Sequence, residues 1–344
     1  MSIQELQIYA LWGGKQTAKG TKNATPAKRF KQEGGKFFSP REDGSVDYSD
    51  ATQYVSTQDW VNTLIGSGNP GILSTPEELS WLLWAFHGGE TTSAVTGPPA
   101  KTKHTSVPLP GLGHWLTFVP RLGSSVVDRE SFNDCQIGQV QMEGSTANKR
   151  VLITPTVLSL DPGEILAADP SATMPTKDGF IYTDGTSRFV IDGTTVRGQS
   201  QFTVTFNKDL QPQYGDDVLV HDFSIGKPVA TVAVTLILDS VGQGVLYKQL
   251  YGTATPATGA KPLKTIPALG SYSFDLRARD ASGAVTGDKF VLTMAGVKWN
   301  VPEAPGPNPA GGNAELALAG SMRKVSGQPA FQVDIDNDAA AHTV

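Results

Sequence analysis

The chain has 344 residues, of which 39% are hydrophobic and 18% charged, with 37 glycines and 23 prolines. This composition is too apolar for a disordered chain and suits many short strands joined by turns. The formal charge of −5 does not mark a nucleic-acid binder, and the single cysteine, Cys135, excludes an intramolecular disulfide and a cysteine zinc cluster.

The N-terminal sequence MSIQELQIYALWGG lacks the features of a secretion signal. No basic segment leads a sustained apolar run, and no stretch approaches the length that spans a bilayer. We therefore expect a protein made in a reducing cytoplasm, without export.

A strand is predicted over residues 6–12, and a long basic segment follows over residues 13–40. This segment holds seven basic residues and one acid, a charge of +6 that leaves −11 on the rest of the chain. A loop of this length either binds something or is disordered, so a solvated arm is the alternative. The phenylalanines favour docking, and the opposite charges predict attraction between copies. The candidate contact residues are Lys15, Lys19, Lys22, Lys28, Arg29, Phe30, Lys31, Phe37 and Phe38.

The clearest local pattern predicts a helix over residues 76–87. An alternating strand over residues 54–65 and a glycine-rich turn over residues 65–70 precede it. Thr75 suits the N-cap, Pro76 the first helical position, and a Gly-Gly pair the C-terminal end. One face at helical spacing is expected to pack on a β-core, with the residues Leu79, Leu82, Leu83 and Phe86.

The rest of the first half predicts a loop and three strands. The proline-rich residues 89–113 are expected to be a loop. Alternating patterns then predict strands over residues 114–120, 134–144 and 150–160. Turn residues fill 161–178, which we interpret as a linker.

The second half repeats this order of elements. Extended segments at 179–192, 201–207 and 229–238 precede a short predicted helix at 245–251. Four strands follow, at 271–278, 289–299, 313–322 and 331–335.

We interpret the chain as two tandem β-repeats, residues 1–160 and 179–338, with a tail at 339–344. Only the first repeat has the basic segment and the longer helix. Two unrelated β-domains, or one domain, are the alternatives.

A search for reactive groups gives no catalytic constellation. The histidines are His87, His104, His114, His221 and His342, and no pair has the spacing of a metal-binding helix. Only His221 has carboxylates close in sequence, which are Asp216, Asp217 and Asp222. A solvated turn explains that cluster better than a metal. We expect no enzyme, no metal site and no cofactor.

Residues 8–21 (IYALWGGKQTAKGT) with the long segment after them, and residues 76–89 (PEELSWLLWAFHGG), carry a resemblance to a known family. Together with the order of elements, they resemble the tail tube, or major tail, proteins of long-tailed bacteriophages. The strands within 114–160 and the segment 291–318 are also similar to that family. The resemblance covers most of the chain.

Membership of that family would imply antiparallel β-sandwich or barrel repeats, each packed by one helix. The subunits would assemble into stacked rings that form a conduit for genome DNA, which passes through the lumen without specific binding. A two-repeat subunit would imply three copies per ring with pseudo-sixfold symmetry. The family implies contacts with tail terminator, tape measure and distal tail proteins, location in the virion tail, no membrane, and a contact loop toward the neighbouring ring at residues 13–40.

The dimensions agree with this interpretation. Six repeats with four strands each give a barrel of about 24 strands, spaced by about 4.8 Å and tilted by roughly 40°, with a diameter of about 48 Å. Since a conduit must not grip DNA, we expect a neutral to acidic lumen, with the basic segment facing another subunit.

Two other functions compete with this one. A tandem β-sandwich adhesin or carbohydrate-binding surface protein would use exposed tryptophans to stack on sugars. A hydrolase would use Asp216, Asp217 and His221, but no pattern fixes these residues in a reacting geometry.

Overall fold

The computed structural model describes residues 9–46, 59–96, 100–123, 129–182, 188–214, 220–264, 268–280, 284–300 and 314–342. Of the strand residues 9, 35–46, 59–64, 122 and 162, only the backbone is described. The predicted strand residues 6–8 and 54–58, together with Asp216 and Asp217, lie outside the described residues.

The first half of the chain forms a continuous antiparallel sheet in the order β2–β1–β7–β8–β9–β4–β3. The central strand, β8, pairs with β9 along most of its length. The strands are β1 (Tyr9–Lys15), β2 (Lys28–Phe30), β3 (Gln32–Val46), β4 (Asp59–Leu73), β7 (Leu116–Leu122), β8 (Glu130–Ser145) and β9 (Leu152–Ile165).

The second half forms a sheet in the order β12–β11–β17–β18–β19–β16–β13, and β10 also pairs with β17. All of these pairings are antiparallel. The strands are β10 (Phe180–Ile181), β11 (Arg188–Ile191), β12 (Thr194–Val196), β13 (Gln199–Asn207), β16 (Val229–Ile237), β17 (Gly270–Arg279), β18 (Val285–Trp299) and β19 (Glu315–Met322).

Two strand pairings join the halves. Residues 139–145 of β8 pair with residues 201–207 of β13. Elsewhere β20 (Gln332–Asn337) lies between β18 and β6 (Lys101–Ser106), which also pairs with β5 (Thr91–Val95). The result is one 18-stranded sheet, with β14 (Leu210–Tyr214) and β15 (Val220–Ile225) as a separate pair. The prediction of a mainly β, antiparallel fold is confirmed.

Helix α1 (Pro76–His87) begins and ends at the predicted residues. Thr75 is the N-cap residue, but its hydroxyl bonds the Glu78 carboxylate instead of a backbone amide. Gly88 ends the helix in the left-handed conformation, with φ of 84°. Nearly every residue of α1 is buried, which is typical of a helix enclosed by a core.

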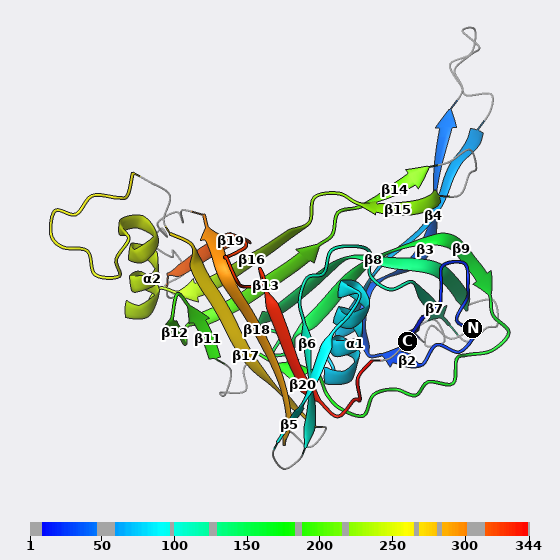
Figure 1. The fold of residues 1–344 in the computed structure, drawn as a ribbon, viewed down its shortest axis with the longest axis horizontal. Helices are drawn as coiled ribbons and strands as arrows, with labels where there is room; N and C mark the ends of the chain where they lie inside the picture. The colour runs from blue at the N-terminus through cyan, green and yellow to red at the C-terminus, as the bar shows by residue number, and fades with distance from the viewer. Residues whose placement is uncertain are drawn as a thin grey trace, which may run out of the picture.

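The core spans both halves, and α1 contacts strands from each of them. The four residues predicted to pack on the core are all buried: Leu79, Leu82 and Leu83 are 0% exposed, and Phe86 is 3% exposed. Helix α1 contacts β2, β6 and β8 of the first half and β18 and β20 of the second. Figure 1 shows α1 among the strands, with α2 at the far end of the molecule.

The second helix, α2 (Ser240–Tyr251), is longer than predicted. It has 12 residues, as α1 has, so the expected difference in length is wrong. The Asp239 side chain accepts hydrogen bonds from the amides of Val241 and Gly242, and this cap starts the helix despite two glycines in its first turns. Neither helix that the structure describes is long and apolar enough to cross a membrane.

Four segments predicted as loops or turns contain strand residues. Residues 28–30 and 32–40 of the basic segment lie in β2 and β3, β5 and β6 lie within the proline-rich residues 89–113, and residues 161–165 of the predicted linker belong to β9. The glycine-rich residues 65–70 continue β4. A side chain at Gly66 would come within 3.0 Å of Phe132 and Ser159, so this glycine permits close packing.

Two hairpins extend from the sheet on the same side of the molecule. Strands β3 and β4 form a long hairpin, and β14 and β15 form a shorter one beside it (Figure 1). Strand β15 contacts β4. The second half therefore carries an extension of its own, which the sequence did not predict.

The cap of α2 generates a test. Replacing Asp239 with Ala removes both capping bonds and is expected to lower the free energy of unfolding by about 1 kcal/mol. Asp239→Asn retains an acceptor oxygen and should keep most of the stability. Urea unfolding measures both variants, and equal stability of Asp239→Ala and the wild type would contradict the capping role.

Candidate functional site

Two lysines of the basic segment, Lys19 and Lys22, bind carboxylates of their own chain. Lys19 Nζ lies 3.1 Å from Asp222, and it also donates to the His221 carbonyl at 2.6 Å. Lys22 lies 2.5 Å from Glu164. Residues 19–22 are therefore docked on the same subunit, which reduces their capacity to attract another one.

Two other basic residues of the segment, Lys15 and Arg29, lie over tryptophan rings. Lys15 Nζ lies 5.2 Å from the centre of the Trp84 ring, and burial lowers the pKa of Lys15. The Arg29 guanidinium lies 5.1 Å from the Trp12 ring. Phe30 is 0% exposed and belongs to the core, so its predicted contact with a neighbouring subunit is wrong.

The remaining predicted contact residues lie on β2, on β3 or between these two strands. Lys31 Nζ is 3.4 Å from Asp178 and 2.6 Å from the Lys177 carbonyl, so it too is bound within the chain. Lys28 is on β2 and half-buried. Phe37 and Phe38 are on β3, where only the backbone is described.

The carboxylates near His221 do not converge with it in the described residues. Asp222 pairs with Lys19, and the His221 side chain is exposed. Partial burial opposes ionisation of Asp222, but hydrogen bonds from the Phe223 amide and Lys19 outweigh it and lower its pKa. Among the described residues, the arrangement provides an ion pair between Asp222 and Lys19.

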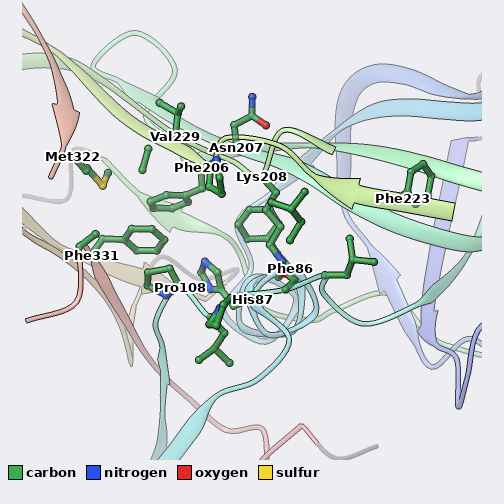
Figure 2. A pocket seen from close by; sticks show the side chains of 18 of the residues that line it. Phe86, His87, Pro108, Phe206, Asn207, Lys208, Phe223, Val229, Met322 and Phe331 are labelled. Atoms are coloured by element: carbon green, nitrogen blue, oxygen red, sulfur yellow. Dashed lines mark hydrogen bonds between the residues drawn. The ribbon is translucent and has the colours of Figure 1, made fainter. Parts of the chain in front are cut away.

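A cavity of about 630 Å³ lies at the junction of the two halves. The C-terminal end of α1 and the loop before β7 line it from the first half, and the ends of β13 and β15 line it from the second. Figure 2 shows Phe86, His87, Phe206 and Phe331 around this space. The lining is mostly apolar and includes no carboxylate among the described residues.

Lys208, directly after β13, supplies a cation to this cavity. Its Nζ donates to the Phe86 carbonyl, and to the Gly111 carbonyl at 3.2 Å. Phe86 is in the last turn of α1, where carbonyls lack helical partners and the dipole favours a cation. Burial lowers the pKa of Lys208 to about 8.

His87 lines the same cavity as a neutral imidazole. Its Nδ1 lies 2.5 Å from the Ser106 hydroxyl, and its Nε2 has no hydrogen-bond partner in the described part of the chain. Burial, together with the nearby Lys208 charge, lowers the pKa of His87 to about 3. The cavity therefore has binding groups, and Ser106, whose hydroxyl contacts His87, is not among the described residues that line it.

A buried cluster of charges lies elsewhere between the halves. Asp288 of β18 is 0% exposed, 3.0 Å from Lys101 of β6 and 3.2 Å from Lys177. Lys177 also binds Glu77 of α1 at 2.5 Å and Asp338 at 2.6 Å. Burial opposes protonation of Lys177, but its hydrogen bonds to Asp338 and Glu77 raise its pKa.

Comparison with known proteins does not identify the chain. No model of a known protein family matches it, and no curated protein sequence matches it.

Sequence reasoning missed both the cavity and the charge cluster. Lys101, Lys177 and Asp288 lie 76 or more positions apart in the sequence. A single charged residue in an alternating sequence pattern does not indicate that its side chain is buried. Only the strand pairings that join the halves bring these side chains together.

The lowered pKa of Lys208 predicts a pH dependence of stability. Between about pH 8 and 10.5 the unfolded chain holds this proton and the folded chain does not, so the free energy of unfolding rises with pH. The free energy of unfolding of the wild type minus that of Lys208→Met should therefore increase from about pH 8 to pH 10.5. Lys208→Arg, which stays charged, should show no such increase. Urea unfolding at several pH values measures this, and a constant wild-type-minus-Met difference would contradict it.

The charge cluster predicts a large effect at Asp288. Asp288→Asn leaves the buried Lys101 and the partly buried Lys177 with less compensation for their charges. We expect this change to lower the free energy of unfolding by about 3 kcal/mol. The control is Asp178→Asn, whose partly exposed pair with Lys31 should contribute less than about 1 kcal/mol. Chemical unfolding compares the two variants, and equal losses would refute the special role of the buried cluster.

Proposed function

We propose that this chain is a structural virion protein, the subunit of a tail tube of a long-tailed bacteriophage. Each chain contributes two repeats of one seven-stranded unit, and three chains close a ring. Stacked rings form the conduit through which genome DNA leaves the virion. The observation that carries the proposal is the common strand order of the two halves.

Seven strands follow the same hydrogen-bonded order in each half. The order β2–β1–β7–β8–β9–β4–β3 corresponds, strand by strand, to β12–β11–β17–β18–β19–β16–β13. The helix follows the corresponding strand in both, since α1 comes after β4 and α2 after β16. Agreement of chain order, pairing and direction supports a duplication.

The helices support the same correspondence in detail. Leu73 and Ile237 each end a strand two residues before an N-cap, and the 12-residue helix after each N-cap ends at a left-handed glycine. The Leu73 amide donates to the Lys31 carbonyl just before β3. In the same way, the Ile237 amide donates to the Gly198 carbonyl just before β13.

The following residues form a second matched pair of bonds. Ser74 donates to the Val151 carbonyl just before β9, and Leu238 donates to the Ala314 carbonyl just before β19. Irregularities in pairing also correspond, because the register shifts after Gln32 in β3 and after Gln199 in β13. Unrelated domains would have no reason to share these features.

The junction inside the chain offers a template for the junction between chains. The outer edge of β13 pairs with β8 of the first half. Strand β3 corresponds to β13, and its outer edge has no strand partner among the described residues. Strand β18 corresponds to β8, and its described pairing with β17 ends at Val297. We propose that β3 of one chain adds beside the C-terminal end of β18 in the next.

Such an addition would close a ring of suitable size. Each chain would supply eight barrel strands, which are β3, β4, β9, β8, β13, β16, β19 and β18. Three chains give about 24 strands and a backbone diameter of about 48 Å. Inward side chains reduce the lumen by roughly 10 Å, which leaves room for a hydrated DNA duplex.

This arrangement changes the role proposed for the basic segment. The backbone of residues 34–40 would join neighbours within a ring. Contacts between rings would instead use the distal β3–β4 hairpin and the β14–β15 hairpin, which extend together from the sheet (Figure 1). The overall charge of −5 agrees with a conduit that does not grip DNA.

Burial of the five tryptophan side chains that the structure describes argues against a carbohydrate-binding adhesin. Trp12 is 2% exposed, Trp81 is 5%, and Trp84 and Trp299 are 4%. Trp115 is half-buried and stacks on Phe223 with a ring separation of 6.3 Å. Stacking on sugar rings would need exposed aromatic faces.

The proposed edge can be tested with two adjacent prolines. The backbone N–H groups of neighbouring residues in a strand point to opposite edges of that strand. One of the variants Gly35→Pro and Lys36→Pro therefore removes a hydrogen bond to β4. The other variant blocks only the outer edge of β3. One variant should keep the wild-type melting temperature yet form no rings or tubes by electron microscopy. Lys36→Ala, which keeps its N–H, should assemble normally. Tube formation by both proline variants would contradict the proposal.

A further inference from the structure

We infer that Glu90, His104 and His342 form a binding site for a divalent transition metal of the zinc class. Glu90 lies between α1 and β5, His104 is on β6, and His342 is in the segment after β20. One ligand atom from each residue lies within 4.8 Å of the other two. The inference depends only on these residues and holds whether or not the chain builds a tube.

The hydrogen bonds of His104 orient one nitrogen toward the site. Its Nε2 lies 3.2 Å from the Ala339 carbonyl, which can only accept, so Nε2 carries the proton. Its Nδ1 lies 3.0 Å from Glu90 Oε2. A second nitrogen fixed by a backbone carbonyl is the usual arrangement of a metal-binding histidine. The metal would replace the proton now shared between Nδ1 and the carboxylate.

His342 has a similar arrangement. Its Nε2 lies 2.8 Å from the Ser80 hydroxyl. Ser80 donates its own proton to the Glu77 carbonyl at 3.0 Å, so it accepts from His342. This leaves Nδ1 of His342 with a lone pair for a metal.

Glu90 is held between the two histidines. Its Oε1 accepts from the His342 backbone amide at 2.8 Å, and its Oε2 faces His104. The Glu90 and His104 side chains are 5% and 2% exposed. Such burial restricts both groups to one geometry, as a preorganised site requires.

Space for a further ligand adjoins the triad. A pocket of about 490 Å³ is lined by Glu90 and His342, and also by Trp84 and His114. Nε2 of His114 is buried and has no hydrogen-bond partner in the described part of the chain. A water molecule in this pocket would complete a four-coordinate site.

The ligand set selects the class of metal. Two imidazoles and one carboxylate suit Zn²⁺ and neighbouring transition metals, whereas Ca²⁺ and Mg²⁺ prefer oxygen ligands throughout. Binding would fasten the segment after β20 to the end of α1 and to β6. The metal would therefore reinforce the contact between the two halves.

Calorimetric titration of the metal-stripped full-length protein with Zn²⁺ tests the site. We expect one equivalent to bind per chain and to raise the melting temperature. Co²⁺ should give the absorption bands of a low-coordinate nitrogen and oxygen site. His342→Ala should weaken Zn²⁺ binding at least about 100-fold, since removing even an outer-shell partner costs 10- to 100-fold.

The matched control is His221→Ala, which removes an exposed histidine outside the triad and should leave affinity unchanged. Circular dichroism confirms that both variants fold. Absence of saturable Zn²⁺ binding in the wild type, or equal affinity in wild type and His342→Ala, would overturn the inference. Loss of tube assembly has no bearing on this result.

Discussion

The pairing of β8 with β13 is the interaction on which the rest of the structure depends. Seven residue pairs, from Gln139 with Asn207 to Ser145 with Gln201, join the two halves into one sheet. The pairing positions Lys208, directly after β13, at the C-terminal end of α1. The same junction creates the apolar cavity, because elements of both halves meet there (Figure 2).

Other interactions then fix the two halves against each other. Strand β20 lies between β18 and β6, and Asp288 with its two lysines is buried nearby. Helix α1 is enclosed by strands from both halves, so the core cannot separate without exposing it. A rigid relation between the halves is what a closed ring requires, because errors in the angle of each subunit accumulate around the ring.

Local signals predicted the elements that carry strong caps or alternation. Residues 76–87 were predicted as a helix because Pro76 and the glycines after His87 mark its ends. Strand β3 was missed, since its glycines and charges resemble a loop and its pairing with β4 is not local information. The start of α2 was missed because glycines obscured a cap that Asp239 supplies. Burial of Phe30, and the meeting of Glu90, His104 and His342, depend on tertiary contacts that single-sequence patterns do not contain.

The number of chains in one ring tests the central claim most directly. Image reconstruction of assembled tubes, combined with the mass per unit length, counts the chains around the axis. We expect three chains with approximate sixfold symmetry in a lumen wall of 24 strands, with β3 of one chain beside β18 of the next. Six chains per ring, or a lumen wall that excludes β8 and β13, would contradict it.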